Sequence, residues 1–349
     1  MQSLPKSTTR KNVAVLLVNL GSPISPGKRD VGRYLKEFLM DPYIIDVPYL
    51  LRYFLVNFMI VPKRSTSSAS LYHKIWTPKG SPLIVNTEKL TNKVANLLKV
   101  PVVMAMRYGE PSIESGLIKL KKQGVVNLYV VPLYPQYAMS TTLTVNEEVE
   151  RQINKHLPGV TVSTTSPFYE DEDYIRVLTA SIKSQLADKA FDHLLFSYHG
   201  VPERHLRKTD PTGNHCLASE NCCETPNKAH GFCYKHQCHV STELVAQSLG
   251  LAPNQYSISF QSRLGKDPWI QPYTSDKIIQ LVQSGIKKLA IVTPAFVSDC
   301  LETIEEIGME ARKEFLQAGG DEFHRILCLN DDNDWADILA KWSKSALNL

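Results

Sequence analysis

The chain of 349 residues is 43% hydrophobic and 21% charged, which is typical of a soluble globular protein long enough for two domains. Its net charge of +4 is modest, and the absence of a long Lys/Arg run excludes an evident nucleic-acid-binding surface. Residues 1–12 are polar and basic without an apolar segment, so we expect no signal peptide and a cytoplasmic protein.

In the first half of the chain, apolar β-branched runs alternate with helical patterns. We expect strands at 13–19, 101–106 and 125–131 and helices at 31–40, 86–99 and 111–123. This alternation predicts a parallel sheet with helices on both faces. Residues 65–82 are rich in Ser, Thr, Pro and Gly, which predicts a long loop.

The second half repeats this scheme. We expect strands at 160–165, 193–198, 256–260 and 288–293 and helices at 172–187, 239–249, 274–284 and 333–347. The last helix is amphipathic, and we expect it to fold back onto the first domain. An irregular insertion rich in Cys and His, residues 207–238, interrupts the second half.

Three short segments occur twice in the same order. They are 16–23 and 195–202, 106–109 and 262–265, and 130–135 and 291–296. Each is an apolar run that ends in Gly or Pro, as a buried parallel strand does where it enters a loop. The repeat predicts two similar doubly wound (Rossmann-like) α/β domains, with parallel four-stranded sheets whose strand ends face a central cleft. We place the domains at 11–155 and 156–325, followed by a C-terminal helical segment at 326–349.

Residues 47–61, VPYLLRYFLVNFMIV, are almost entirely apolar, and Pro62-Lys63-Arg64 follows. This segment is shorter than the roughly 20 residues that span a bilayer. It fits either a buried core helix or an exposed lip beside the cleft. In the second case, the lip would rest on a membrane surface with Lys63 and Arg64 towards anionic head groups.

A histidine and a row of acids follow repeated strands. His199 ends the run LLFSYHG, where it could accept a proton or bind a metal. Glu302, Glu306 and Glu310 recur every four residues, which places three carboxylates on one helix face. A divalent cation such as Fe²⁺, a shared proton or plain solvation could each compensate their repulsion.

Arginines and aromatic residues are also expected around the cleft. Arg107 and Arg263 end equivalent strands, where they could bind an anionic ligand or pair with the protein's own acids. Several aromatic side chains near the predicted loops would suit a large flat apolar ligand, although such residues often only pack together. They are Trp76, Tyr134, Tyr137, Trp269 and Tyr273.

Five of the seven cysteines follow the pattern C-x5-C-C-x9-C-x4-C. They are Cys216, Cys222, Cys223, Cys233 and Cys238. The C-x2–4-C pairs typical of zinc sites are absent unless the adjacent Cys222 and Cys223 count as one. Four thiolates on an irregular loop favour a [2Fe–2S] cluster, while zinc and no metal remain alternatives. Cys300 and Cys328 stand alone and are expected to be buried.

The chain resembles the ferrochelatases, the enzymes that insert ferrous iron into a porphyrin at the end of haem synthesis. The resemblance covers about residues 12 to 345. It rests on VNLGSP (18–23), GRYLKEFLMDP (32–42), KGSPL (79–83), MRYGEPS (106–112), VVPLYPQYAMSTT (130–142), SYHGVPER (197–204), FQSRLGKDPWIQPYT (260–274) and PAFVSDCLETIEEI (294–307).

The resemblance implies that His199 and Glu302 are the catalytic and metal-binding pair, with Glu306 and Glu310 as a proton or iron relay. It also implies porphyrin binding, for which we nominate Arg107, Tyr108, Tyr134 and Trp269. Residues 47–82 would form the lip of the porphyrin pocket and make peripheral contact with the inner face of the membrane through 47–64.

Some ferrochelatases carry a [2Fe–2S] cluster, and a subset uses an internal cysteine-rich insertion of this type. Four of the five clustered cysteines would hold it; Cys216, Cys233 and Cys238 plus one of the adjacent pair are favoured. The implied substrates are Fe²⁺ and protoporphyrin IX. A cobalt-loading chelatase and a two-domain porphyrin- or metal-binding protein without turnover are the alternatives.

Overall fold

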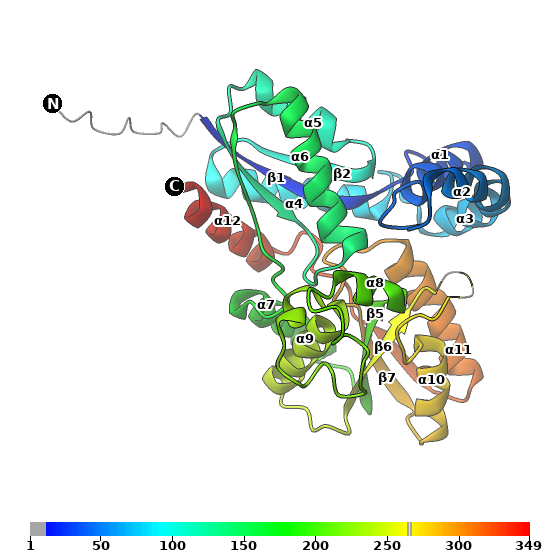
Figure 1. Cartoon of the computed structure of the whole chain (residues 1–349). Coiled ribbons are helices and arrows are strands. Elements are labelled where there is room, and N and C mark those ends of the chain that lie inside the picture. Colours follow the sequence, from blue (N-terminus) through cyan, green and yellow to red (C-terminus); the bar gives the residue numbers. More distant parts are fainter. Residues whose placement is uncertain (1–11, 264, 266) are drawn as a thin grey trace.

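The computed structural model describes residues 12–263, 265 and 267–349, and within them it contains two parallel four-stranded sheets (Figure 1). Lys11, the expected start of the first domain, lies outside the described residues. Leu264 and Lys266, which belong to the second arginine segment and its motif, also lie outside them.

The first sheet has the strand order β2-β1-β3-β4. Its strands are β1 (Val13–Ser22), β2 (Val102–Gly109), β3 (Asn127–Pro132) and β4 (Thr161–Thr164). Alternate residues of β1 enter different cores. Leu17 packs with α4 (Pro82–Leu98) on one face, and Leu16 packs with α5 (Ile113–Lys122) and α6 (Thr144–His156) on the other. Burial on both faces explains the continuous apolar sequence of this strand.

The second sheet repeats this arrangement in the order β6-β5-β7-β8. Its strands are β5 (His193–His199), β6 (Tyr256–Gln261), β7 (Lys288–Val292) and β8 (Glu322–Arg325). The surrounding helices include α7 (Glu172–Leu186), α8 (Glu203–Thr209), α9 (Tyr234–Leu249), α10 (Thr274–Gln283) and α11 (Arg312–Gln317). The duplicated sequence segments therefore mark equivalent strands, and the predicted fold class is confirmed.

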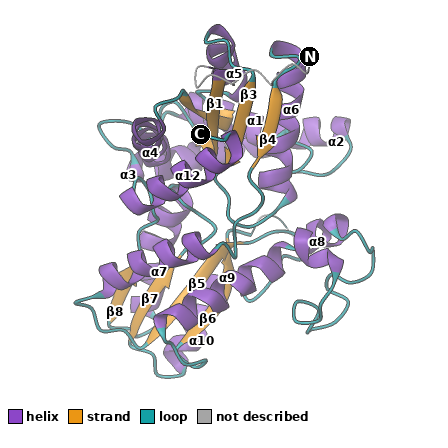
Figure 2. Cartoon of the chain, turned by 90° about the vertical axis from the view of Figure 1, so that its left-hand side faces the viewer, coloured by secondary structure: helices purple, strands orange, loops and turns teal. Residues whose placement is uncertain are grey.

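Two strands differ from the sequence expectation. β4, which the boundary after residue 155 assigns to the second domain, pairs in parallel with β3, so the first sheet extends to Thr164. β8 was not predicted and forms the equivalent edge of the second sheet. The final helix, α12 (Asn333–Leu347), packs against α4 of the first domain, and Figure 2 shows it beside that helix.

The predicted loop at 65–82 is wrong for most of its length, because α3 runs from Val61 to Ile75. The buried side chains of this helix follow helical spacing; they are Ser65, Ala69, Tyr72 and Ile75. Ser65 is polar and Ala69 is small, so the four together give no clear hydrophobic pattern. The helix packs closely on α1 (Lys28–Leu39).

The lip segment contains α2 (Tyr49–Phe54), a π-helical segment (Leu55–Ile60) and α3, and Figure 1 shows it projecting with α1 to one side of the first sheet. Most of the large apolar side chains in α2 and the π-helical segment are exposed, which contradicts the core-helix interpretation of 47–61. They include Tyr49, Leu50, Leu51, Tyr53, Phe54, Phe58 and Met59. Among the described residues, no helix combines the length and apolarity needed to cross a bilayer.

The base of the lip is tied to the second domain by a buried carboxylate. The Asp46 side chain is 5% exposed and accepts hydrogen bonds from Arg204 Nε at 2.7 Å and from Lys208. Both donors lie on α8, the helix that follows His199 along the chain. These contacts lower the pKa of Asp46 despite the opposing effect of burial. The loop that leads into the lip is therefore fixed against the segment that follows the site histidine.

Candidate active site

His199 is the last residue of β5, and its position depends on the glycine that follows. The ring Nδ1 lies 2.6 Å from Gly200 O, and the ring centroid lies 6.4 Å from that of Trp269 and 6.3 Å from that of Phe296. A Cβ on Gly200 would come within 2.8 Å of Gln261 O and 3.1 Å of Trp269. Only glycine lets β5 end this close to β6, which presents the imidazole at the domain junction.

The carboxylate row lies on a π-helical segment, Glu302–Ala311, rather than on a regular α-helix. Such segments are rare in proteins, and those that occur are often found at functional sites. Glu302 and Glu306 are partly buried, whereas Glu310 is exposed, so the row leads from the domain junction towards solvent. A fourth acid, Glu305, has a side chain only 2% exposed.

Glu306 is linked to the histidine strand through hydrogen bonds. Its carboxylate accepts from Ser262 Oγ and from Gln261 Nε2, the latter at 3.3 Å. Gln261 in turn accepts a hydrogen bond from Ser197 Oγ of β5 at 2.8 Å.

The pKa of the Glu306 carboxyl group reflects both its burial and its neighbours. Burial raises this pKa, and the charge of Glu302 adds to the rise. The hydrogen bond from Ser262 and the nearby imidazole of His199 oppose the rise. His199, Glu302 and Glu306 are thus electrostatically linked at one site, as expected for groups that exchange protons or handle a cation.

The first domain contributes residues that the sequence analysis did not assign to the site. Tyr34 of α1 and Tyr72 of α3 are buried, and the charge of Glu302 is among the influences that raise the pKa of each phenol, after burial. Tyr34 lies in a pattern that the sequence predicts only as a helix face, and Tyr72 lies in the segment that the sequence predicts as a loop. Tyr34 is part of GRYLKEFLMDP, the one signal that could have indicated a role at the site.

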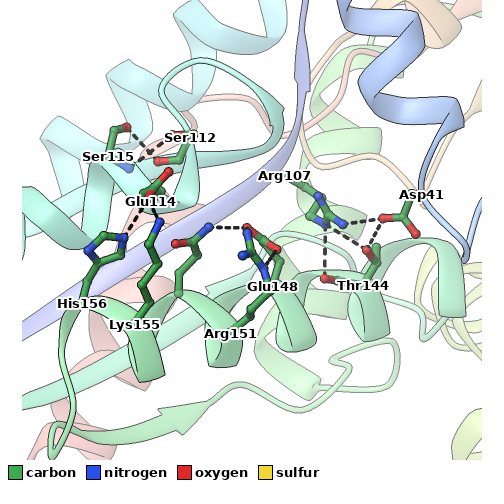
Figure 3. Close-up of polar contacts among 11 residues, drawn as sticks. Asp41, Arg107, Ser112, Glu114, Ser115, Thr144, Glu148, Arg151, Lys155 and His156 are labelled. Atoms are coloured by element: carbon green, nitrogen blue, oxygen red, sulfur yellow. Dashed lines mark hydrogen bonds and ion pairs between the residues drawn. The ribbon is translucent and has the colours of Figure 1, made fainter.

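Arg107 is paired with an acid of the same domain. Its guanidinium pairs with Asp41, and its Nε donates to Thr144 Oγ1 at 2.9 Å, as Figure 3 shows. The Tyr108 hydroxyl donates to Asp41 at 2.9 Å, and its side chain is completely buried. This network anchors the start of the lip loop at Asp41. The pairing with the protein's own acid, one of the two alternatives for Arg107, is therefore present in the structure.

The other two nominated porphyrin-binding residues are nearly buried. Tyr134 is 9% exposed, and no hydrogen-bond partner for its hydroxyl is found within the described part of the chain. Trp269 is 8% exposed and forms an isolated antiparallel β-bridge with Pro202, and its ring lies close to Gly200. Arg263 lies with its guanidinium 4.6 Å from the Tyr273 ring centre.

Four of the five clustered cysteines approach one another. The Cys233 thiol is hydrogen-bonded to the thiols of Cys216 and Cys223, and Cys222 interacts electrostatically with the latter two. Cys238 lies on α9, completely buried and hydrogen-bonded to Tyr234. Burial raises the pKa of its thiol, and the charge of Cys233 adds to this rise.

Backbone contacts hold the insertion in place. Asp210 Oδ2 accepts hydrogen bonds from the backbone N–H groups of His215 and Cys216, both at 2.8 Å. His236 Nδ1 donates to Cys223 O at 2.7 Å. Cys300 and Cys328 are buried, as expected.

Across residues 12–263, 265 and 267–349, no group of three or more His, Cys, Asp or Glu side chains is already arranged as a metal-coordination shell. At the junction, His199 with Glu302 and Glu306 offers one imidazole and two carboxylates, a donor set suited to Fe²⁺. In the insertion, thiols alone gather, a donor set suited to an iron–sulfur cluster or zinc.

Solved structures share this architecture. SirB from Bacillus subtilis with Fe³⁺ matches with a TM-score of 0.53 at 15% identity, covering 97% of this chain and 96% of that one. The sirohydrochlorin chelatase SirB from Bacillus subtilis subspecies spizizenii in complex with cobalt matches with a TM-score of 0.50 at 13% identity. At this identity the likeness concerns the fold, which is that of the two-domain α/β chelatases.

Sequence comparisons narrow this class to one family. The family model for ferrochelatase matches residues 12–347. A ferrochelatase from Stutzerimonas stutzeri is 49% identical over 94% of this chain and 96% of its own length. Those from Pseudomonas fluorescens and Azotobacter vinelandii are each 48% identical, with similar coverage. The chain belongs to the ferrochelatase family.

Proposed function

We propose that this protein inserts Fe²⁺ into protoporphyrin IX with the release of two protons, the last step of haem biosynthesis. The observation that carries the proposal is the junction of His199 with Glu302 and Glu306 in a chain that matches named ferrochelatases over almost its whole length. Insertion requires no redox change, only a base for the pyrrole protons and ligands that deliver the metal.

The residues at the junction divide this work. His199 accepts the pyrrole protons, and Glu302 is its acidic partner. Glu306 and Glu310 pass protons or Fe²⁺ between the junction and solvent, which is supported by the exposure of Glu310 and the partial burial of Glu306. The raised pKa of Glu306 supports a proton-carrying role, because its carboxyl group retains a proton at a higher pH than an ordinary glutamate does.

Porphyrin binding is assigned to Arg107, Tyr108 and Tyr134 of the first domain and to Trp269 of the second. Arg107 provides positive charge for the porphyrin carboxylates, while Tyr108 holds Asp41 and thereby orients Arg107. Tyr134 and Trp269 provide apolar surface for the macrocycle. The lip brings the porphyrin from the membrane, since its apolar side chains are exposed beside Lys63 and Arg64, and the protein is then cytoplasmic with peripheral contact to the membrane.

An anaerobic assay tests the proposed reaction. Purified protein with Fe²⁺ and protoporphyrin IX is expected to convert the free-porphyrin spectrum into that of the metallated ring with multiple turnovers. Tight porphyrin binding without metallation would overturn the proposal in favour of a binding protein. Metallation with Co²⁺ of a precursor tetrapyrrole, but not of protoporphyrin with Fe²⁺, would favour the cobalt-loading alternative.

We also propose that the insertion holds a [2Fe–2S] cluster through Cys216, Cys222, Cys223 and Cys233. The contacts among these four thiols support this set over one that includes Cys238, whose thiol is engaged by Tyr234. A cluster here would cross-link the insertion and add a redox-active centre that insertion of Fe²⁺ does not itself require.

Paired cysteine substitutions test this ligand set. Cys216→Ser is expected to abolish the visible absorption and reduced-state paramagnetic resonance signal of a [2Fe–2S] cluster, because one thiolate ligand is lost. Cys238→Ser, the matched control, is expected to retain both signals. Loss of the signals in Cys238→Ser with retention in Cys222→Ser would restore the set favoured from the sequence. Stoichiometric zinc without iron in the anaerobically purified protein would contradict the cluster.

A further inference from the structure

A lysine from the lip reaches across the domain junction to the carboxylate helix. Lys74 Nζ of α3 lies 2.5 Å from Glu305 Oε1. The lysine side chain is 47% exposed, whereas the glutamate side chain is 2% exposed. The two helices also pack together through Tyr72 and Ile75 of α3 against Leu301 and Ile304. The ammonium group is thus held at one place on the carboxylate helix while remaining open to solvent.

Lys74 acts on more than its direct partner. Burial raises the pKa of the Glu310 carboxyl group and the charge of Glu305 adds to this rise, whereas Lys74 lowers it. One ammonium therefore compensates a buried acid and an exposed acid at the solvent end of the row. Lys313 and Glu314 also affect this pKa, the first lowering it and the second raising it, but both lie on α11, close to Glu310 along the chain. Of the two lysines, Lys74 is the one that comes from the opposite domain.

We propose that Lys74 is a built-in counter-ion of the carboxylate row, which competes with divalent metal for these acids and sets the metal concentration at which the enzyme works. This inference rests on the proposed passage of metal along the row. Four glutamates lie within nine residues, from Glu302 to Glu310, on one helix. Four carboxylates without a nearby positive charge would bind a divalent cation tightly. Passage of the metal to the porphyrin requires binding that is weak enough for release.

The alternative is that Lys74 only neutralises a buried carboxylate. A purely structural pair predicts that loss of either partner harms the protein in the same direction, because both substitutions break one ion pair. A counter-ion predicts opposite effects on metal affinity. Removal of the lysine makes the row more negative, whereas removal of the Glu305 charge makes it less negative.

The experiment compares Lys74→Gln, Glu305→Gln and the double variant. The first measurement is kcat and KM for Fe²⁺ at saturating porphyrin under anaerobic conditions. The second is calorimetric binding of Co²⁺ without porphyrin, which does not depend on turnover. Lys122→Gln, an exposed lysine on α5, is the control for a charge change of the same size elsewhere.

Lys74→Gln is expected to lower both the metal KM and the Co²⁺ Kd by about three- to tenfold, as loss of one nearby charge in a partly exposed site would do. Glu305→Gln is expected to raise both, and the double variant to return towards the wild type. Lys74→Arg is expected to match the wild type. The effect of Lys74→Gln should shrink as salt is raised.

Unchanged metal KM and Co²⁺ Kd in Lys74→Gln, with a lower melting temperature alone, would overturn the inference. Shifts of the two single variants in the same direction would also overturn it. Failure of the proposed reaction is distinguishable, because a wild-type protein without turnover would still show whether Lys74 weakens Co²⁺ binding.

Discussion

Replacement of His199 by alanine is expected to lower kcat for Fe²⁺ insertion by about 10²- to 10⁴-fold, the range associated with loss of a general base. The imidazole ends β5 at the domain junction, where it influences the Glu306 carboxyl group. Among the described histidines, only His199 has ring contacts with Trp269 and Phe296. The measurement is initial-rate metallation of protoporphyrin with Fe²⁺ under anaerobic conditions.

Porphyrin binding separates loss of chemistry from loss of structure. In titrations with porphyrin, the intrinsic fluorescence of the His199→Ala protein is expected to be quenched as in the wild type. The dissociation constant for porphyrin should be similar. His324→Ala, on the edge strand β8, is the control and should keep its activity. Metallation by His199→Ala at the wild-type rate would remove the proposed role of this residue. A loss of porphyrin binding together with activity would instead assign His199 to the pocket.

Replacement of Glu302 by glutamine is expected to lower kcat by about 100-fold, because the substitution removes the charge that partners His199 while keeping the side-chain shape. The same change at Glu310 should have the smallest effect of the three, since Glu310 is exposed whereas Glu302 and Glu306 are partly buried. Activity in this series is measured with the same assay at saturating metal. The expected difference follows the path from the junction to solvent.

Glu314→Gln is the control for this series, because Glu314 continues the four-residue spacing onto α11 and is exposed. We expect it to be fully active. A loss of activity in Glu314→Gln equal to that in Glu302→Gln would show that general negative charge, not position at the junction, matters. Equal activity of all four variants would mean that the row is a solvated helix face.

Much of the fold could be predicted because the chain repeats itself. The segments at 16–23 and 195–202 contain most of β1 and β5, the strands at equivalent places in the two sheets, and the other two pairs lie on or directly after the strands beside them. Strands buried on both faces must be apolar throughout, so their sequences are distinctive and their duplication is visible. His199 could be found for the same reason, since it ends such a strand, and the acids at 302–310 lie on the segment that follows the loop after another such strand.

The features that the sequence did not predict have weak local patterns. The strand β4 is expected from the sequence, but its residues are exposed, so only its pairing with β3 places it in the first sheet. Helix α3 buries Ser65 and Ala69 against α1, where small side chains permit close packing without a hydrophobic signal. Exposure of the lip could not be settled either, because an apolar segment of 15 residues fits a core and a surface equally well.

By itself, the sequence determined the two-domain parallel fold, the family and the candidate residues, since strong periodicity and ordered motifs are local properties of the chain. The tertiary structure decided which residues become partners. It joined Lys74 to Glu305, paired Arg107 with Asp41, and placed the Cys238 thiol against Tyr234. The first two outcomes depend on contacts between distant segments, whose free energies are set by burial and charge compensation after the two domains have packed together.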